Sequence, residues 1–275
     1  MKKITKLISL LCLAAAFVLA SCSSSTSGGG ITYIGSKAPT EPKDVGDIVF
    51  NDGSATPYAK INERTITPKI TTEEKAAAIA VIFYVGTGLN SDDANGDSDN
   101  TTVRTLGVGL KHDKTGLAWC RWNSRTDYAN GFSKIITTIT CTIDSGDKNG
   151  SDNLEQIGNF LGTANNDTTT LSNYPAFQFG KEYSTAATKG TDYDKSGWYL
   201  PSLAELYAIY NVKTTVDAAS SLCGGSRFAY DWYWSSSQYA SLDVDAYGLY
   251  FSNGYRDGLD KNNDEIYVCA VRAFN

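Results

Sequence analysis

Apolar residues in the middle of the chain fall into short runs with two different repeats. Residues 79–85 (IAVIFYV) form an unbroken, β-branched run, which is typical of a buried strand. Residues 106–110 alternate between large apolar and smaller side chains, and this period of two predicts a second strand. In residues 152–162 the apolar positions recur at helical spacing and end at a glycine, which predicts a helix.

The clearest helix signal follows Pro201. Ser202 and Glu205 form the S-x-x-E pattern of a capping box, in which each side chain accepts a hydrogen bond from a free backbone amide at the helix start. The apolar residues that follow lie on one predicted face: Leu203, Leu206, Tyr207 and Tyr210.

The C-terminal part of the chain changes to short strands and turns. Residues 247–251 alternate in size and run into Asn253-Gly254, a favoured tight-turn pair. Residues 266–274 are apolar almost throughout, which is typical of a central strand covered on both sides. The whole pattern predicts an α+β fold of short antiparallel strands with a few helices. Because no internal repeat or second linker interrupts it, residues 31–275 are expected to form a single domain.

The first 21 residues have the form of an export signal. Three lysines precede an apolar stretch, residues 7–20, that is too short for a comfortable membrane-spanning helix. The stretch ends in Leu19-Ala20-Ser21-Cys22, which resembles the lipobox of bacterial lipoproteins. The resemblance implies cleavage before Cys22, followed by a diacylglycerol on its thiol and an acyl group such as palmitate on its amine. An ordinary secretory signal is the alternative.

Residues 22–30 then consist of the lipidated cysteine and a flexible tether, SSSTSGGG, which has no side chains able to pack. Ser23 follows the cysteine where an aspartate would favour retention in the inner membrane. We therefore expect a lipid anchor in the outer membrane of a bacterium, with the folded part at the cell surface.

Net charge narrows the choice of partners. The 275-residue chain carries a formal charge of −6, and loss of Lys2, Lys3 and Lys6 with the signal makes it more negative. Sequence-independent nucleic-acid binding needs a cationic face, so no nucleic-acid partner is expected. The single histidine, His112, excludes most histidine-based catalysis and histidine-rich metal sites.

Four cysteines remain in the mature part beyond the anchor: Cys120, Cys141, Cys223 and Cys269. An even number in an exported protein permits two disulfides with three pairings. We favour Cys120–Cys141 with Cys223–Cys269, and buried free thiols are the alternative. No C-x-x-C pair is present, so a redox or zinc site has little support.

Two polar segments, residues 91–100 and 144–153, are dense in oxygen ligands of the kind calcium prefers. Neither matches the EF-hand loop, because the first has Ser98 at the glycine position and the second lacks the closing glutamate. We interpret both as solvated surface loops and expect no metal.

Four ordered motifs lie in the last 80 or so residues: 197–206 (GWYLPSLAEL), 233–237 (YWSSS), 251–254 (FSNG) and 271–274 (VRAF). Their order resembles bacterial domains of the formylglycine-generating-enzyme type, a branch of the C-type lectin fold. Residues 46–54 also resemble the start of such domains. The resemblance implies a C-type lectin fold of this type.

Within that family the chain is most similar to variable lipoproteins of diversity-generating retroelements, of the Treponema variable protein A kind. In those systems asparagine codons at the 3′ end of the gene are rewritten at adenines, which cannot produce Trp, Lys, Gln, Glu or Met. Residues 241–245 and 255–260 contain only types that this process permits. The excluded types nearby lie at or beside the framework motifs: Trp232, Trp234, Gln238, Lys261 and Glu265.

The resemblance implies a variable ligand-binding region at about residues 228–260. Tyrosines among small polar residues suit such a surface, because tyrosine offers large contact area at low entropy cost. The candidate binding residues are Tyr230, Asp231, Tyr239, Ser241, Leu242, Asp243, Val244, Asp245, Tyr247, Tyr255, Arg256, Asp257, Leu259 and Asp260. For Tyr247, a position in the hydrophobic core is the alternative. We interpret Trp234, Phe251 and Val271 as core residues.

Enzyme activity is not expected. The family's namesake oxidises a substrate cysteine with two closely spaced cysteines, whereas Cys223 and Cys269 are 46 positions apart. A calcium-dependent, carbohydrate-binding lectin is the alternative, although the Glu-Pro-Asn and Trp-Asn-Asp triplets of such sites are absent. We expect a monomer that needs no cofactor and binds an unidentified protein or glycan ligand, on a host or on another cell.

Overall fold

The computed structural model describes residues 31–90, 101–121, 148–163, 171–239, 242 and 244–274. Residues from Tyr33 onward cluster into one compact unit. Several sequence predictions fall outside the described residues: the signal peptide, Cys22 and the tether, the polar segment 91–100, residues 144–147, Cys141, Ser241 and Asp243. The rest of the polar segment 144–153 is described, and its interpretation as a solvated loop was wrong, because Gly150–Asn153 begins a helix and Asn149 and Asn153 are buried.

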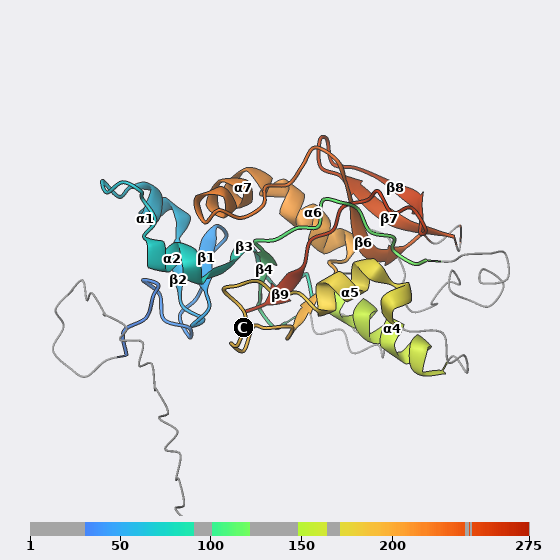
Figure 1. Ribbon diagram of the computed structural model, residues 1–275, viewed down its shortest axis with the longest axis horizontal. Helices are drawn as coiled ribbons and strands as arrows, with labels where there is room; N and C mark the ends of the chain where they lie inside the picture. Colours follow the sequence, from blue (N-terminus) through green and yellow to red (C-terminus); the bar gives the residue numbers. More distant parts are fainter. Residues whose placement is uncertain are drawn as a thin grey trace, which may run out of the picture. The chain divides into compact units, whose positions relative to one another are not determined.

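The larger sheet has six strands, and every neighbouring pair in it is antiparallel (Figure 1). Its spatial order is β2 (Ala55–Pro57), β1 (Asp47–Phe50), β3 (Ala78–Gly86), β4 (Arg104–Gly109), β9 (Val271–Ala273) and β5 (Trp198–Tyr199). The predicted strands at 79–85 and 106–110 are thereby confirmed as β3 and β4.

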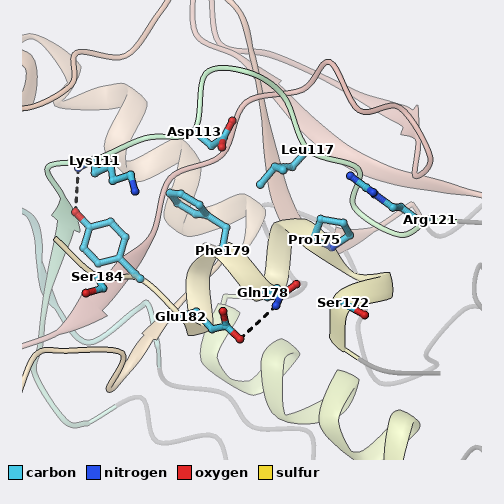
Figure 2. Close-up of a pocket in the computed structure, with 11 residues that line it drawn as sticks. Lys111, Asp113, Leu117, Arg121, Ser172, Pro175, Gln178, Phe179, Glu182 and Ser184 are labelled. Carbon is cyan, nitrogen blue, oxygen red and sulfur yellow. Dashed lines mark hydrogen bonds between the residues drawn. The ribbon is translucent and has the colours of Figure 1, made fainter. Parts of the chain in front are cut away.

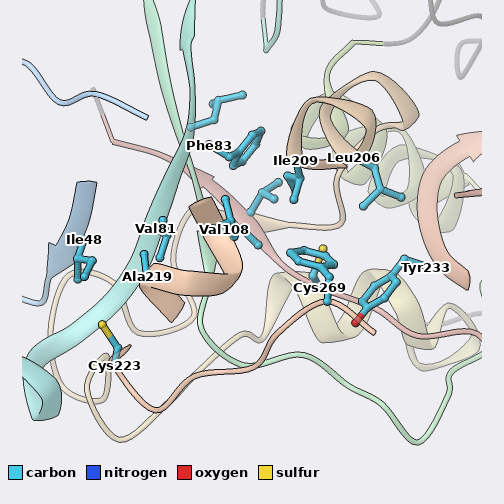
Figure 3. Close-up of a cluster of buried hydrophobic side chains, with 14 of the residues drawn as sticks. Ile48, Val81, Phe83, Val108, Leu206, Ile209, Ala219, Cys223, Tyr233 and Cys269 are labelled. Atoms are coloured by element: carbon cyan, nitrogen blue, oxygen red, sulfur yellow. The ribbon is translucent and has the colours of Figure 1, made fainter. Parts of the chain in front are cut away.

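Strand β3 is an unbroken apolar run because both faces of the sheet are covered. Val81 and Phe83 join one hydrophobic cluster, while Ile79 and Ile82 join another on the opposite face. The first cluster extends to residues from the helices, including Leu206, Ile209 and Ala219, as Figure 3 shows. Burial of large aliphatic side chains in this layer is the main stabilising contribution to the sheet.

A second, three-stranded antiparallel sheet contains β6 (Trp232–Gln238), β7 (Asp245–Tyr250) and β8 (Tyr255–Asp260) in that order. Strand β7 is in the middle and β8 is at the edge. Gly254 closes the turn between them with a φ of 75°, which explains the Asn-Gly pair at this point. The α+β class with antiparallel sheets and few helices is therefore the observed one.

The helices are α1 (Tyr58–Asn62), α2 (Thr72–Ala77), α4 (Gly150–Thr163), α5 (Pro175–Lys181), α6 (Leu203–Asn211) and α7 (Lys213–Leu222), with a short 3₁₀ turn, η1 (Leu171–Asn173). Helix α4 confirms the prediction at 152–162. Within the segments that the structure describes, no helix has the length and apolar character needed to cross a membrane.

The capping box at the start of α6 is formed as predicted. The Ser202 hydroxyl accepts a hydrogen bond from the Glu205 amide at 3.3 Å, and the Glu205 carboxylate accepts one from the Ser202 amide at 2.8 Å. The same carboxylate also accepts a bond from the Gly150 amide at 3.0 Å and one from the Tyr199 hydroxyl at 2.9 Å. Glu205 is fully buried, so it joins α6, β5 and the start of α4 inside the protein.

The apolar segment 266–274 is not one continuous strand, contrary to the sequence pattern. Only Val271–Ala273 pairs as β9, between β4 and β5. Tyr267 instead makes a bridge to Tyr233 in the second sheet, and Val268 makes one to Asp113. The segment is apolar because it connects the two sheets through the interior, where its residues are buried on successive partners.

The favoured Cys223–Cys269 disulfide is not formed, and this prediction was wrong. Both residues are buried free thiols, which was the alternative. Cys223 follows the end of α7, whereas Cys269 lies at 0% exposure beside β9 and the ring of Tyr233, as the separate positions in Figure 3 show. The other favoured disulfide, Cys120–Cys141, stays a prediction, because Cys141 lies outside the described residues.

Candidate ligand-binding surface

Strand β6 is the buried base of the candidate surface. Its three serines are buried and each is tied to a neighbouring element. The Ser235 hydroxyl donates to the Tyr247 carbonyl at 2.7 Å, Ser236 accepts from the Asn153 side chain at 2.7 Å, and Ser237 accepts from the Leu203 amide at 2.9 Å. The Y-W-S-S-S motif is therefore a framework that fixes the sheet on α4 and α6.

Edge strand β8 is the exposed part of the same sheet. Tyr255 is 56% exposed, and Arg256, Asp257 and Asp260 are exposed as well. The Tyr255 hydroxyl donates to the Asp257 carboxylate at 3.2 Å, and that carboxylate also accepts the Gly258 amide at 2.9 Å. Four of the candidate binding residues thus lie on one edge strand and are exposed to solvent.

A row of aromatic rings supports the start of β8. Trp232, Tyr250 and Tyr255 are register partners across the three strands. The Trp232 ring lies 5.3 Å from the Tyr250 ring and 6.0 Å from the Tyr255 ring, centroid to centroid. Such contacts hold the exposed tyrosine in a defined orientation.

The opposite end of the sheet carries a second tyrosine pair. The Tyr239 and Tyr247 rings are 4.9 Å apart, and a side chain at Gly258 would come within 2.9 Å of the Tyr239 ring. Tyr247 is half-buried and packs against the main hydrophobic cluster, so it combines the core and surface positions that the sequence left open. Tyr247 lies on β7, as the alternation at 247–251 predicts, and Tyr255 is the first residue of β8.

The remaining candidates divide between the two ends of the sheet. Tyr230 is 75% exposed, with the Lys213 ammonium 5.0 Å from its ring centre, and Asp231 hydrogen-bonds the Trp232 amide at 2.8 Å. At the other end Leu242 is 51% exposed, its carbonyl accepts the Asp245 amide at 3.2 Å, and the Val244 carbonyl accepts the Lys261 amide at 2.9 Å.

Strand β8 connects these two groups and spans about 17 Å at a rise of about 3.4 Å per residue. Along it Leu259 is half-buried against the cluster that contains Trp234. Trp234, Phe251 and Val271 are buried, as expected for core residues. The structure thus collects most of the described candidates on one sheet, with a cluster at each end.

Lys261 is a supporting residue whose role the sequence did not reveal. It is fully buried at the end of β8, its ammonium donates to the Gln238 side chain at 2.6 Å, and it lies 4.7 Å above the ring centre of Trp119. Trp119 in turn donates its indole N–H to the Ser235 carbonyl at 2.9 Å. Lys261 therefore fixes the end of the edge strand to the buried base of the sheet.

Replacing Lys261 with alanine is expected to lower the free energy of unfolding by about 2–4 kcal/mol, because it opens a cavity and removes the charged donor to Gln238. Urea unfolding measures this change. The matched control is Lys60→Ala, which removes an exposed lysine and should stay within about 0.5 kcal/mol of the wild type. Equal effects of the two substitutions would contradict the supporting role.

The thiols of Cys223 and Cys269 and the imidazole of His112 are held in their neutral forms. Burial raises the pKa of the Cys223 thiol to about 12 and also raises that of Cys269, so both thiols stay protonated at neutral pH. Burial, with a smaller effect of Lys114, lowers the pKa of His112 to about 3 and keeps its ring neutral. Among the described residues, no group of three or more His, Cys, Asp or Glu side chains is placed to hold a metal ion.

Two cavities lie apart from the candidate surface, and no sequence motif predicts them. The first, of about 540 Å³, lies between the segment after β4 and helix α5, and its lining includes Lys111, Leu117, Arg121 and Phe179 (Figure 2). The second, of about 620 Å³, includes Lys75, Lys189 and Cys223 in its lining. No residue of 228–260 lines either cavity.

Comparison with known proteins gives a fold and no family. No protein-family model and no curated protein matches the chain. A crystal structure of a fimbrial protein from Bacteroides ovatus ATCC 8483 is similar, with a TM-score of 0.56 and 16% sequence identity over 84% of this chain. The match covers 49% of that protein, so the chain spans about half its length. At this identity the likeness shows a shared fold.

Proposed function

We propose that the chain is a surface-displayed recognition lipoprotein whose second sheet binds the ligand. In this proposal the scaffold is a C-type lectin fold of the formylglycine-generating-enzyme type. Residues 228–260 are the binding region, and a diversity-generating retroelement rewrites them. The protein acts by binding and not by catalysis.

The observation that carries the proposal is the agreement between burial and codon chemistry. Of the five nearby residues whose types adenine mutagenesis of asparagine codons cannot produce, Trp234, Gln238 and Lys261 are at most 1% exposed. Trp232 is half-buried, and Glu265, beyond residue 260, is exposed. Tyr255–Asp257 consists of permitted types and is exposed along its length. A diversified binder needs this division, because changes at exposed positions leave the packed framework intact.

The dimensions of the surface favour a macromolecular ligand. Two clusters about 17 Å apart along β8 offer a broad contact area, which suits a protein surface or a large glycan better than one small molecule. The exposed tyrosines Tyr230 and Tyr255 are of the residue type that most often dominates binding energy at interfaces. Carboxylates and Arg256 beside them supply polar contacts at the rim.

Location at the cell surface is part of the same proposal. Its support is the lipobox-like Leu19-Ala20-Ser21-Cys22, the tether that follows it, and the likeness in fold to a fimbrial protein. A lipid on Cys22 would anchor the protein in the outer membrane, and the tether would hold the folded part away from the lipid.

Sequencing tests the proposal directly. We expect that the 3′ end of the gene, read across many isolates, varies at the codons of Tyr230, 241–245 and 255–260. A near-identical template and a reverse transcriptase gene should lie within several kilobases. The codons of Trp234, Gln238 and Lys261 are the internal control and should not change. An invariant 3′ end without a template would overturn the diversification.

A further inference from the structure

The two cavities outside the candidate surface are neighbours, and we refer to them together as the groove. Lys111 and Ser184 line both cavities, of about 540 and 620 Å³. One half lies along α5 and the segment 111–121, and the other half lies between α2 and residues 223–225. Each half has the volume of a typical small-molecule site, so together they suit an elongated ligand.

The groove has an excess of cations on a protein whose formal charge is −6. The second cavity is lined by Lys75, Lys111 and Lys189 without a carboxylate, whereas in the first cavity Lys111 and Arg121 are matched by Asp113 and Glu182. Among the described residues none of these four cations forms an ion pair with a carboxylate. Such a local excess attracts anions.

The two acidic residues are partly occupied within the protein. One oxygen of Asp113 accepts bonds from the Thr115 amide, the Thr115 hydroxyl and the Gly116 amide at 2.8, 2.8 and 3.1 Å. Glu182 accepts a bond from the Gln178 side chain at 3.3 Å, which is drawn in Figure 2. Both carboxylates keep their negative charge, and their hydrogen bonds hold them in place. Among the described residues, neither of them pairs with a cation of the groove.

The uncharged lining suits sugar rings. The half-buried ring of Phe179 lies between Lys111 and Arg121 in Figure 2, with Leu117 and Pro175 nearby. An aromatic ring packs well against the C–H face of a pyranose, and neighbouring amide and hydroxyl groups bind its hydroxyls. Small residues line the other half, including Gly224 and Gly225, so a ring can approach the backbone there.

We propose that this groove binds an acidic oligosaccharide, a chain of uronic-acid or sulfated sugar units. Its carboxylates or sulfates would pair with Lys75, Lys111, Arg121 and Lys189, and a ring would stack on Phe179. The site is separate from the second sheet and needs no metal ion, so it is independent of the diversified surface and of a calcium-dependent lectin.

The test is titration calorimetry of the mature protein with tetragalacturonate, in the presence of EDTA. The comparison ligands are maltotetraose, a neutral chain of the same length, and tetraglutamate, an acidic peptide. We expect tetragalacturonate to bind, with affinity falling at least about tenfold between 20 and 300 mM salt. Maltotetraose and tetraglutamate should bind at least about tenfold more weakly.

Two variants locate the site. Lys111→Ala with Arg121→Ala should weaken tetragalacturonate binding at least about tenfold, and Phe179→Leu should weaken it while leaving its salt dependence unchanged. Lys60→Ala with Lys69→Ala removes the same charge from exposed positions elsewhere and should bind as the wild type does.

Three results would overturn the proposal. The first is no binding of tetragalacturonate at low salt, and the second is an equal loss in the Lys60/Lys69 control. In the third, tetraglutamate binds as tightly as the sugar, which would make the groove an acidic-peptide site. Circular dichroism of each variant ensures that a lost affinity is measured on folded protein.

Discussion

Replacing His112 with phenylalanine is expected to make the protein progressively less stable than the wild type as the pH rises from 5 to 6.5. His112 is buried, with its ring 4.4 Å from that of Phe228 and 5.7 Å from that of Tyr233, centroid to centroid. Burial lowers its pKa from 6.5 to about 3, so the folded protein holds the imidazole neutral. Phenylalanine keeps an aromatic ring at this position and removes the titration. It also removes the ring nitrogen that lies 3.4 Å from the Tyr233 hydroxyl, a loss that does not depend on pH in this range.

The sign follows from proton binding. Between pH 3 and 6.5 the unfolded chain protonates His112 and the folded protein does not, so the wild type gains stability as the pH rises. The gain is about 1.4 kcal/mol per pH unit, or about 2 kcal/mol from pH 5 to 6.5, and the variant lacks it.

Urea unfolding of both proteins at pH 5, 5.75, 6.5 and 8 gives the difference in the free energy of unfolding. The difference should become constant above pH 6.5, and this plateau is the control for lost packing. Lys114→Ala is a second control, since Lys114 contributes less to the low pKa than burial does. A difference that is the same at all four pH values would show that His112 titrates normally in the folded protein.

The sequence predicted best those elements whose signal is local. The run at 79–85, the helical repeat at 152–162 and the capping box at Ser202 are all complete within a few residues, and all three form as expected. Strand β8 is different, because YRDGLD has hardly any apolar pattern. It is a strand because it pairs with β7 over six residues, and that pairing depends on tertiary structure.

The structural setting of the candidate residues was predictable only in part. Motif order proposed a region at 228–260, and most of the described candidates lie on one sheet, while ligand binding by this sheet stays a prediction. The sequence could not show that Leu259 is half-buried or that Lys261 lies over Trp119, 142 positions away in the chain. The burial of Leu259 and the position of Lys261 both depend on contacts between residues that are far apart in the sequence.

The groove and the cysteines also depend on distances between remote residues, which the sequence does not reveal. Lys75, Lys111, Arg121 and Lys189 come from separate segments, which the fold brings to one groove without any common motif. Cys223 and Cys269 were paired by counting, and counting has no information on distance. Their burial in apolar surroundings shows that both are packed as small hydrophobic residues.

Replacing Glu205 with glutamine is expected to have the opposite pH dependence to the His112 variant. Burial raises the pKa of the Glu205 carboxyl from 4.5 to about 7, although its hydrogen bonds with Ser202, Tyr199 and Gly150 partly offset this. Between these values the folded protein holds the proton and the unfolded chain does not, so the wild type loses stability as the pH rises. The glutamine variant should therefore gain about 2–3 kcal/mol relative to the wild type between pH 5 and 7.

The two buried groups thus oppose each other between pH 4.5 and 6.5, where His112 adds stability with rising pH and Glu205 removes it. The free energy of unfolding of the wild type should consequently change less with pH in this window than that of either variant. In the double variant, the two opposite slopes should cancel relative to the wild type, because each titration contributes its own slope. A residual slope in the double variant would show that one of the two pKa shifts is misassigned.

Alanine at the same position separates charge from hydrogen bonding. Glu205→Ala leaves the Ser202 and Gly150 amides without their acceptor, and both lie in a buried region. Each unpaired buried donor costs about 1–3 kcal/mol, so we expect a loss of about 3–5 kcal/mol at pH 5, where glutamine should be nearly neutral. Urea unfolding of the three proteins at pH 5 measures this order. If the alanine and glutamine variants had the same free energy of unfolding at pH 5, the hydrogen bonds of the Glu205 side chain would not hold α6 to the start of α4.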